Sequence, residues 1–81
     1  MPLEVHLFAS LRDAAGKPRL GIDAATPLTV ARLKELIGER FPALKPHLQA
    51  ARVAVDLEFR EGDYLIESGS EVALIPPVSG G

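Results

Sequence analysis

Apolar residues occupy every second position from Leu3 to Leu7, and the same alternation returns at Leu20 and Ile22. A period of two places alternate side chains on opposite faces of an extended chain, so both segments predict half-buried β-strands. Residues 13–18 contain a glycine and a proline and indicate a turn between them. We therefore expect these two strands to form a hairpin.

A helical period replaces this alternation in the middle of the chain. Apolar residues recur every three or four positions, at Val30, Leu33, Leu36, Ile37 and Phe41. Thr29 suits the N-cap of this helix, and Pro42 should end it. Gly38, inside the helix, indicates either close packing or an imperfect helix. Leu44 and Leu48 predict one or two further helical turns.

The second half of the chain returns to a period of two from Arg52 onward. Turn-forming residues at 61–63 and 68–70 separate three short strand-like runs. These runs lie at 57–59, 64–66 and 72–75. The order strand, strand, helix, strand, short strand, strand predicts an α+β fold in which one main helix packs on one face of a mixed sheet. We assign residues 1–75 to this domain and residues 76–81 to a flexible tail.

Composition narrows the possible functions. The 81 residues are enough for one small domain, and the net charge of −2 without a Lys/Arg block argues against nucleic-acid or anionic-membrane partners. No apolar run is long enough to span a membrane, and the start does not resemble a signal peptide, so we expect a cytoplasmic protein. Cysteine is absent, which excludes thiolate chemistry on a side chain.

Side chains suited to catalysis are also scarce. His6 and His47 are the only histidines, too few for an ordinary metal site without cysteine partners, so no metal is expected. The serines lack a recognisable base, and no glycine-rich loop precedes a helix. We expect neither a bound cofactor nor an independent active site.

The end of the sequence carries the candidate chemistry. Gly80 and Gly81 follow a strand-like run and a spacer of four residues: Pro76, Pro77, Val78 and Ser79. The prolines lack backbone donors and favour an extended conformation, so the last six residues project at most about 20 Å. A tail without bulky side chains at its end can enter a narrow active site in another protein. We predict that the Gly81 carboxylate is the reactive group, although a merely frayed terminus is the simpler alternative.

Several segments together carry a resemblance to a known family. They are Leu7–Asp13 with Gly16, Thr29–Val30, Val53–Val55 and the ending Pro76–Gly81. The chain resembles the small, sulfur-carrying subunits of molybdopterin synthase, which are ubiquitin-like β-grasp proteins. The Pro-Pro-Val-Ser-Gly-Gly ending is the specific part of the match. Asp56, where the family usually has Asn, and residues 68–70, where an acidic turn is common, depart from the family pattern.

The resemblance implies a role in molybdenum cofactor biosynthesis. An adenylating enzyme related to ubiquitin activators would consume ATP and join AMP to the Gly81 carboxylate. A sulfur donor would convert the acyl adenylate to a thiocarboxylate, and the tail would deliver sulfur to a pyranopterin precursor in the large catalytic subunit, forming the molybdopterin dithiolene. Two small and two large subunits form the usual family assembly.

Three apolar side chains point away from the expected core. Phe8 and Ile75 alternate with Leu7 and Leu74, which we assign to the helix-facing core, and Phe59 ends the short run after Asp56. Because the opposite face of a β-grasp sheet is uncovered, an apolar cluster there indicates a docking surface. We expect these three residues to contact the large subunit and the adenylating enzyme. Ordinary core or edge packing is the alternative.

Other functions share the same terminal glycines. The chain could be a sulfur carrier for thiazole synthesis or tRNA thiolation, or a protein modifier joined to lysines. The Pro-Pro-Val-Ser spacer and the extended helical region favour the molybdenum pathway. A non-catalytic binding module whose glycines are incidental is the alternative from another class.

Overall fold

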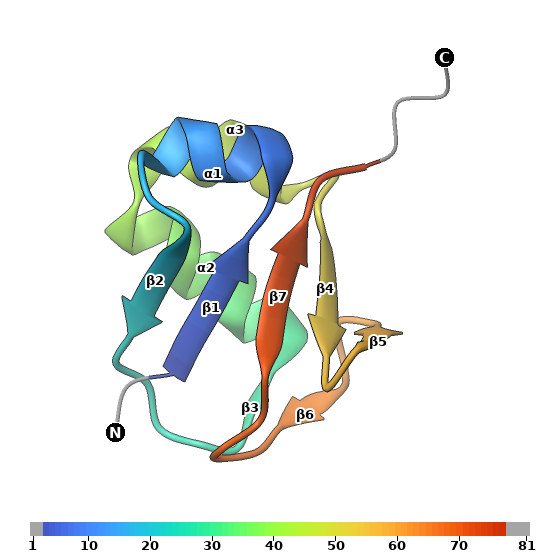
Figure 1. Cartoon of the computed structure of the whole chain (residues 1–81). Helices are drawn as coiled ribbons and strands as arrows, with labels where there is room; N and C mark the ends of the chain where they lie inside the picture. Colours follow the sequence, from blue (N-terminus) through green and yellow to red (C-terminus); the bar gives the residue numbers. More distant parts are fainter. Residues whose placement is uncertain (1–2, 78–81) are drawn as a thin grey trace.

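The computed structural model describes residues 3–77 (Figure 1). Its elements are, in chain order, β1 (Leu3–Leu7), α1 (Ala9–Ala15), β2 (Arg19–Ile22), β3 (Leu28–Thr29), α2 (Val30–Arg40), the 3-10 helix η1 (Pro42–Leu44), α3 (Lys45–Leu48), β4 (Arg52–Val55), β5 (Glu58–Arg60), β6 (Leu65–Ile66) and β7 (Val72–Ile75). Five strands form one sheet in the order β2, β1, β7, β4, β5, and β3 pairs with β6. The fold is the expected α+β, ubiquitin-like β-grasp arrangement.

The central strands of the sheet determine where the tail begins. β7 runs parallel to β1 on one side and antiparallel to β4 on the other. The expected pairing of β1 with β2 is confirmed and antiparallel. Because β7 is hydrogen-bonded along both edges, its last residue, Ile75, is firmly placed in the sheet. The chain therefore leaves the domain from a rigid central strand.

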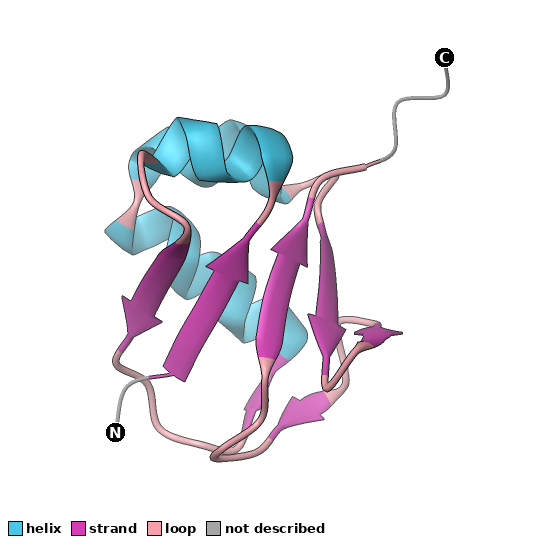
Figure 2. Ribbon diagram, viewed as in Figure 1, coloured by secondary structure: helices cyan, strands magenta, loops and turns pink. Residues whose placement is uncertain are grey.

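The main helix, α2, lies on one face of the sheet, and the core fills the space between these two layers (Figure 2). Alternation in β1 is as predicted, with Leu3, Val5 and Leu7 buried. Fully buried side chains from the facing elements include Leu33, Ile37, Val53, Val55, Val72 and Leu74. Burial of this apolar surface is the main source of stability in a domain of this size.

One helix was not predicted. Residues 9–15 form α1, although the sequence pattern indicated a turn beginning at residue 13. The segment is rich in alanine and buries Leu11 completely, and it ends at Gly16, whose φ of 76° closes the helix in the left-handed conformation. A helix of seven residues is too short to show a clear apolar period. The expected hairpin of β1 and β2 is therefore connected through a helix.

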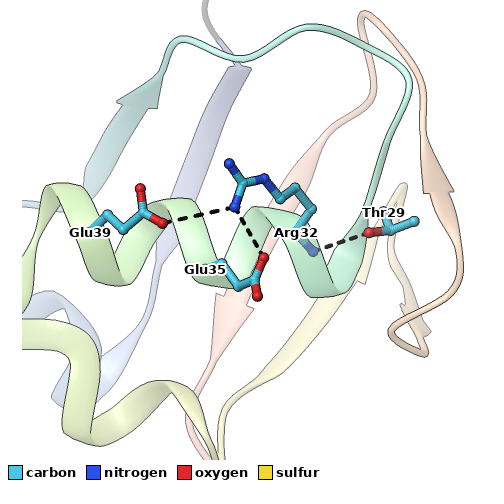
Figure 3. Close-up of polar contacts among 4 residues, drawn as sticks. All are labelled: Thr29, Arg32, Glu35 and Glu39. Atoms are coloured by element: carbon cyan, nitrogen blue, oxygen red, sulfur yellow. Dashed lines mark hydrogen bonds and ion pairs between the residues drawn. The ribbon is translucent and has the colours of Figure 1, made fainter.

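The start of α2 agrees with the sequence (Figure 3). The Arg32 backbone N–H donates to Thr29 Oγ1 at 3.1 Å, so Thr29 is the N-cap. The Arg32 guanidinium lies 3.1 Å from a Glu35 oxygen and 3.8 Å from a Glu39 oxygen. These ion pairs are exposed and add little stability. The helix ends at Arg40, before the expected proline.

Gly38 marks close packing between α2 and α3. A Cβ atom at this buried position would lie 3.2 Å from Leu48 Cδ1 and 3.7 Å from Lys45 Cγ. The two helices approach closely because glycine has no side chain. Of the two interpretations of Gly38, close packing is therefore the one that the structure supports. The further helical turns expected around Leu44 and Leu48 are confirmed as η1 and α3.

Candidate functional site

The sheet face opposite the helices carries a shallow apolar groove. Sheet register places His6, Ala73, Ala54 and Phe59 side by side across β1, β7, β4 and β5. The small alanine side chains in the middle of this row leave a hollow between larger neighbours. The groove has a volume of about 270 Å³. Its lining residues are His6, Phe8, Ala54, Leu57, Phe59, Glu71, Ala73 and Ile75.

All three predicted docking residues line this groove. Phe8 follows β1 two residues after His6, and Ile75 follows Ala73 by two positions in β7, so both point to the same face of the sheet. Phe8 is 47% exposed and Phe59 50% exposed, while Ile75 is half-buried. Phe8 and Phe59 are too exposed to be core residues, whereas edge packing stays an alternative to docking. Their role in docking stays a prediction.

Leu57 is a fourth large apolar residue of the groove, and the sequence analysis did not assign it. It lies in the turn between β4 and β5 and is 89% exposed. The sequence analysis placed it at the start of the strand-like run 57–59. If Asp56 and Leu57 had been recognised as a two-residue turn between paired strands, the sequence would have predicted an exposed Leu57 side chain.

Charged groups border the groove. The Arg52 guanidinium lies 4.2 Å from the centroid of the Phe59 ring, and Arg52 is opposite Ile75 in the sheet. His6 Nε2 lies 3.6 Å from Glu4 Oε1 near the other side. An apolar centre with a polar rim is the usual anatomy of a protein–protein contact. The Arg52 guanidinium thus covers one side of the Phe59 ring, which lies opposite Ala54 in the sheet.

The tail begins at the edge of this groove. Pro76 is half-buried and Pro77 is exposed directly after β7 (Figure 1). The remaining predicted tail residues, Val78, Ser79, Gly80 and Gly81, lie outside the described residues. The assignment of residues 76–81 to a separate tail therefore stays a prediction, while its starting point beside Ile75 is part of the structure.

Other kinds of site were sought within residues 3–77. No group of three or more His, Cys, Asp or Glu side chains is arranged to hold a metal ion there. None of the helices in this part of the chain has the length and apolar character needed to cross a bilayer. His47 is exposed in α3 and does not line the groove.

Comparisons with known proteins cover nearly the whole chain. A family model described as the ThiS family matches residues 5–81. A molybdopterin synthase sulfur carrier subunit from Dictyostelium discoideum is 35% identical over 83 residues, which cover 96% of this chain and 94% of the relative. The match includes the region of the predicted tail as well as the folded domain.

Solved structures give the same fold. SAMP1 of Haloferax volcanii, a small archaeal modifier protein, superposes with a TM-score of 0.86 at 28% identity, covering 100% of both chains. A chain in the complex of subunits 1 and 2 of molybdopterin-converting factor from Helicobacter pylori gives a TM-score of 0.68 at 22% identity, again covering 100% of both. At that identity the second similarity shows the shared fold alone.

Proposed function

This chain belongs to the ThiS family, and from that membership we propose that it is a sulfur carrier subunit of molybdopterin synthase. Several curated relatives with this name match it over nearly its full length, including one at 32% identity that covers 98% of the chain. The observation that carries the proposal is the apolar groove beside the start of a tail that ends in two glycines.

The chemistry is assigned to the Gly81 carboxylate. One carboxylate oxygen attacks the α-phosphorus of ATP on the activating enzyme, and pyrophosphate leaves. Hydrosulfide supplied by a sulfur donor then attacks the acyl carbon, AMP leaves with the bonding electron pair, and the thioacid loses its proton. The product is a thiocarboxylate on Gly81. A free carboxylate is a poor electrophile, so adenylation supplies the leaving group that the sulfur step requires.

The role of the described domain is to bind partners and to position the tail. Catalytic groups come from the enzymes that receive the tail, so the protein acts as a sulfur-donating subunit and co-substrate. Phe8, Phe59 and Ile75 contact the large catalytic subunit, and the activating enzyme uses the same face. Because β7 anchors the tail beside the groove, docking of the groove directs Gly80 and Gly81 into the partner's active site.

The reach of the tail sets the geometry of this complex. Residues 76–81 extend at most about 20 Å from the end of β7. The reacting atoms of the large subunit must therefore lie within that distance of its contact with the groove. A heterotetramer of two small and two large subunits in the cytoplasm belongs to the same proposal.

Mass spectrometry of the intact protein tests the function. Protein purified from its own cells, or after incubation with the activating enzyme, ATP and a sulfur donor, should gain the mass difference between sulfur and oxygen. Fragmentation should place the gain on Gly81. Purified large subunit and precursor should then return the protein to its original mass while forming the dithiolene. Failure to load sulfur with an active enzyme set would contradict the proposal.

A second candidate function is supported by the similarity to the archaeal modifier protein. The same acyl adenylate could be attacked by a lysine amine instead of a sulfur donor, which would form an isopeptide bond and release AMP. Branched peptides containing the Gly80–Gly81 remnant on lysines of other proteins would support this function. Their absence from cells that contain the thiocarboxylate would favour the carrier role alone.

A further inference from the structure

Leu57 combines two unfavourable features. Its side chain is 89% exposed, and its backbone φ is 71°. With Asp56, at φ 51°, it forms the two-residue connection between β4 and β5. Turns of this kind need positive φ at both positions and favour Asn-Gly or Asp-Gly, because other residues are strained there. An exposed leucine at the second position stabilises neither the turn nor the core.

The turn is nevertheless held firmly in place. The Asp56 N–H donates to the Glu71 carbonyl oxygen at 2.8 Å, and the Glu71 N–H donates to Asp56 Oδ1 at 2.9 Å. These two bonds join the turn to the segment that enters β7. Leu57 is therefore presented by a well-defined backbone. A turn whose backbone is already ordered loses less entropy when it binds a partner.

Strained backbone in this protein is concentrated around the groove. Within residues 3–77, the non-glycine residues with positive φ are Ala9, Asp56 and Leu57. Ala9 directly follows Phe8, and Leu57 itself lines the groove. Strain of this kind persists where the surrounding structure enforces it, and it is common at functional sites. Its distribution here links the β4–β5 turn to the docking face.

Leu57 also extends the apolar surface along the sheet. Ile75 lies at the tail end of the groove, opposite Arg52 at the start of β4, whereas Leu57 follows the other end of β4 (Figure 1). The exposed apolar surface thus runs from the base of the tail to the tip of the hairpin. A contact of this length suits a subunit that stays bound, because stable interfaces bury more apolar surface than transient ones.

We infer that Leu57 is an anchor residue for the large subunit, inserting its side chain into an apolar pocket of that protein when the tail enters the active site. The inference rests on the proposed function. It commits to the large subunit because an apolar surface that runs from the base of the tail to the hairpin suits a stable contact between two subunits better than a transient encounter. The strained backbone of the β4–β5 turn positions the Leu57 side chain for this contact.

Leu57→Asn tests the inference, because asparagine tolerates positive φ and removes the apolar side chain. The variant should bind the purified large subunit roughly tenfold or more weakly by calorimetry, as loss of an apolar anchor side chain does. Its midpoint of thermal unfolding should stay the same or rise. Leu57→Met should retain most of the affinity. Leu65→Asn is the matched control, because Leu65 is 51% exposed but lies outside the groove.

Three results would overturn the inference. The first is unchanged affinity of Leu57→Asn for the large subunit. The second is a fall in the unfolding midpoint that accounts for the weaker binding. The third is a loss of thiocarboxylate formation by the same factor, since that would place Leu57 at the activating enzyme. Failure of the wild-type chain to load sulfur and to bind the large subunit would instead contradict the proposed function.

Discussion

Single side chains on the open sheet face contribute little to the core. Phe8 is about half exposed and, as the N-cap residue of α1, makes no side-chain capping hydrogen bond. Its contribution to the core is correspondingly small. The exposure of single residues was also the feature hardest to predict from the sequence. Leu57 is exposed because it lies in a two-residue turn with positive φ, and an alternation pattern does not reveal such a turn.

Phe8→Ala should separate these two contributions. Removing a half-exposed ring should reduce the free energy of unfolding by about 1 kcal/mol. Removing the same ring from the centre of a contact should cost about 2 kcal/mol of binding free energy, or roughly thirtyfold in affinity for the large subunit. Thermal unfolding and calorimetric titration measure the two effects. Leu65→Ala is the control, and equal losses in folding and binding would contradict a docking role.

At the scale of elements, the longest patterns were the most predictable. α2 was identified with its N-cap and its end, because eleven residues show a clear helical period between Thr29 and Pro42. α1 was missed because its seven residues bury only Leu11. The groove was only partly predictable, since its floor depends on the register that brings Ala54 beside Ala73, and register is not contained in the pattern of a single strand.

Thr29→Ala tests the capping of α2. Loss of the hydrogen bond from the Arg32 N–H to Thr29 Oγ1 should reduce the free energy of unfolding by about 1 kcal/mol. In a domain of this size the midpoint of thermal unfolding should then fall by roughly 4–8 °C. Thr29→Ser keeps an accepting hydroxyl and should restore most of the stability. An equal loss in both variants would show that the methyl group, and not the cap, is responsible.

At the scale of the whole molecule, the proposed reactive group lies outside the part of the chain that forms the described core. The buried apolar cluster of the described residues runs from Leu3 to Leu74, and β7 ends at Ile75. The terminal glycines were evident from the sequence because they need no tertiary context. The position of the tail relative to the groove was not evident, because it depends on the place of β7 between β1 and β4 in the sheet.

Deleting Gly81 tests this separation. The midpoint of thermal unfolding should be unchanged, because the core of the described residues ends before the tail. Thiocarboxylate formation should be abolished, since the new terminal carboxylate is withdrawn by one residue, about 3.5 Å, from the position where the activating enzyme binds ATP. An alanine added after Gly81 moves the carboxylate by the same distance in the other direction and should also prevent loading. Ser79→Ala is the control, because it keeps the length of the tail and should load normally. Normal loading of either length variant, measured by intact mass, would show that the position of the terminal carboxylate does not determine activation.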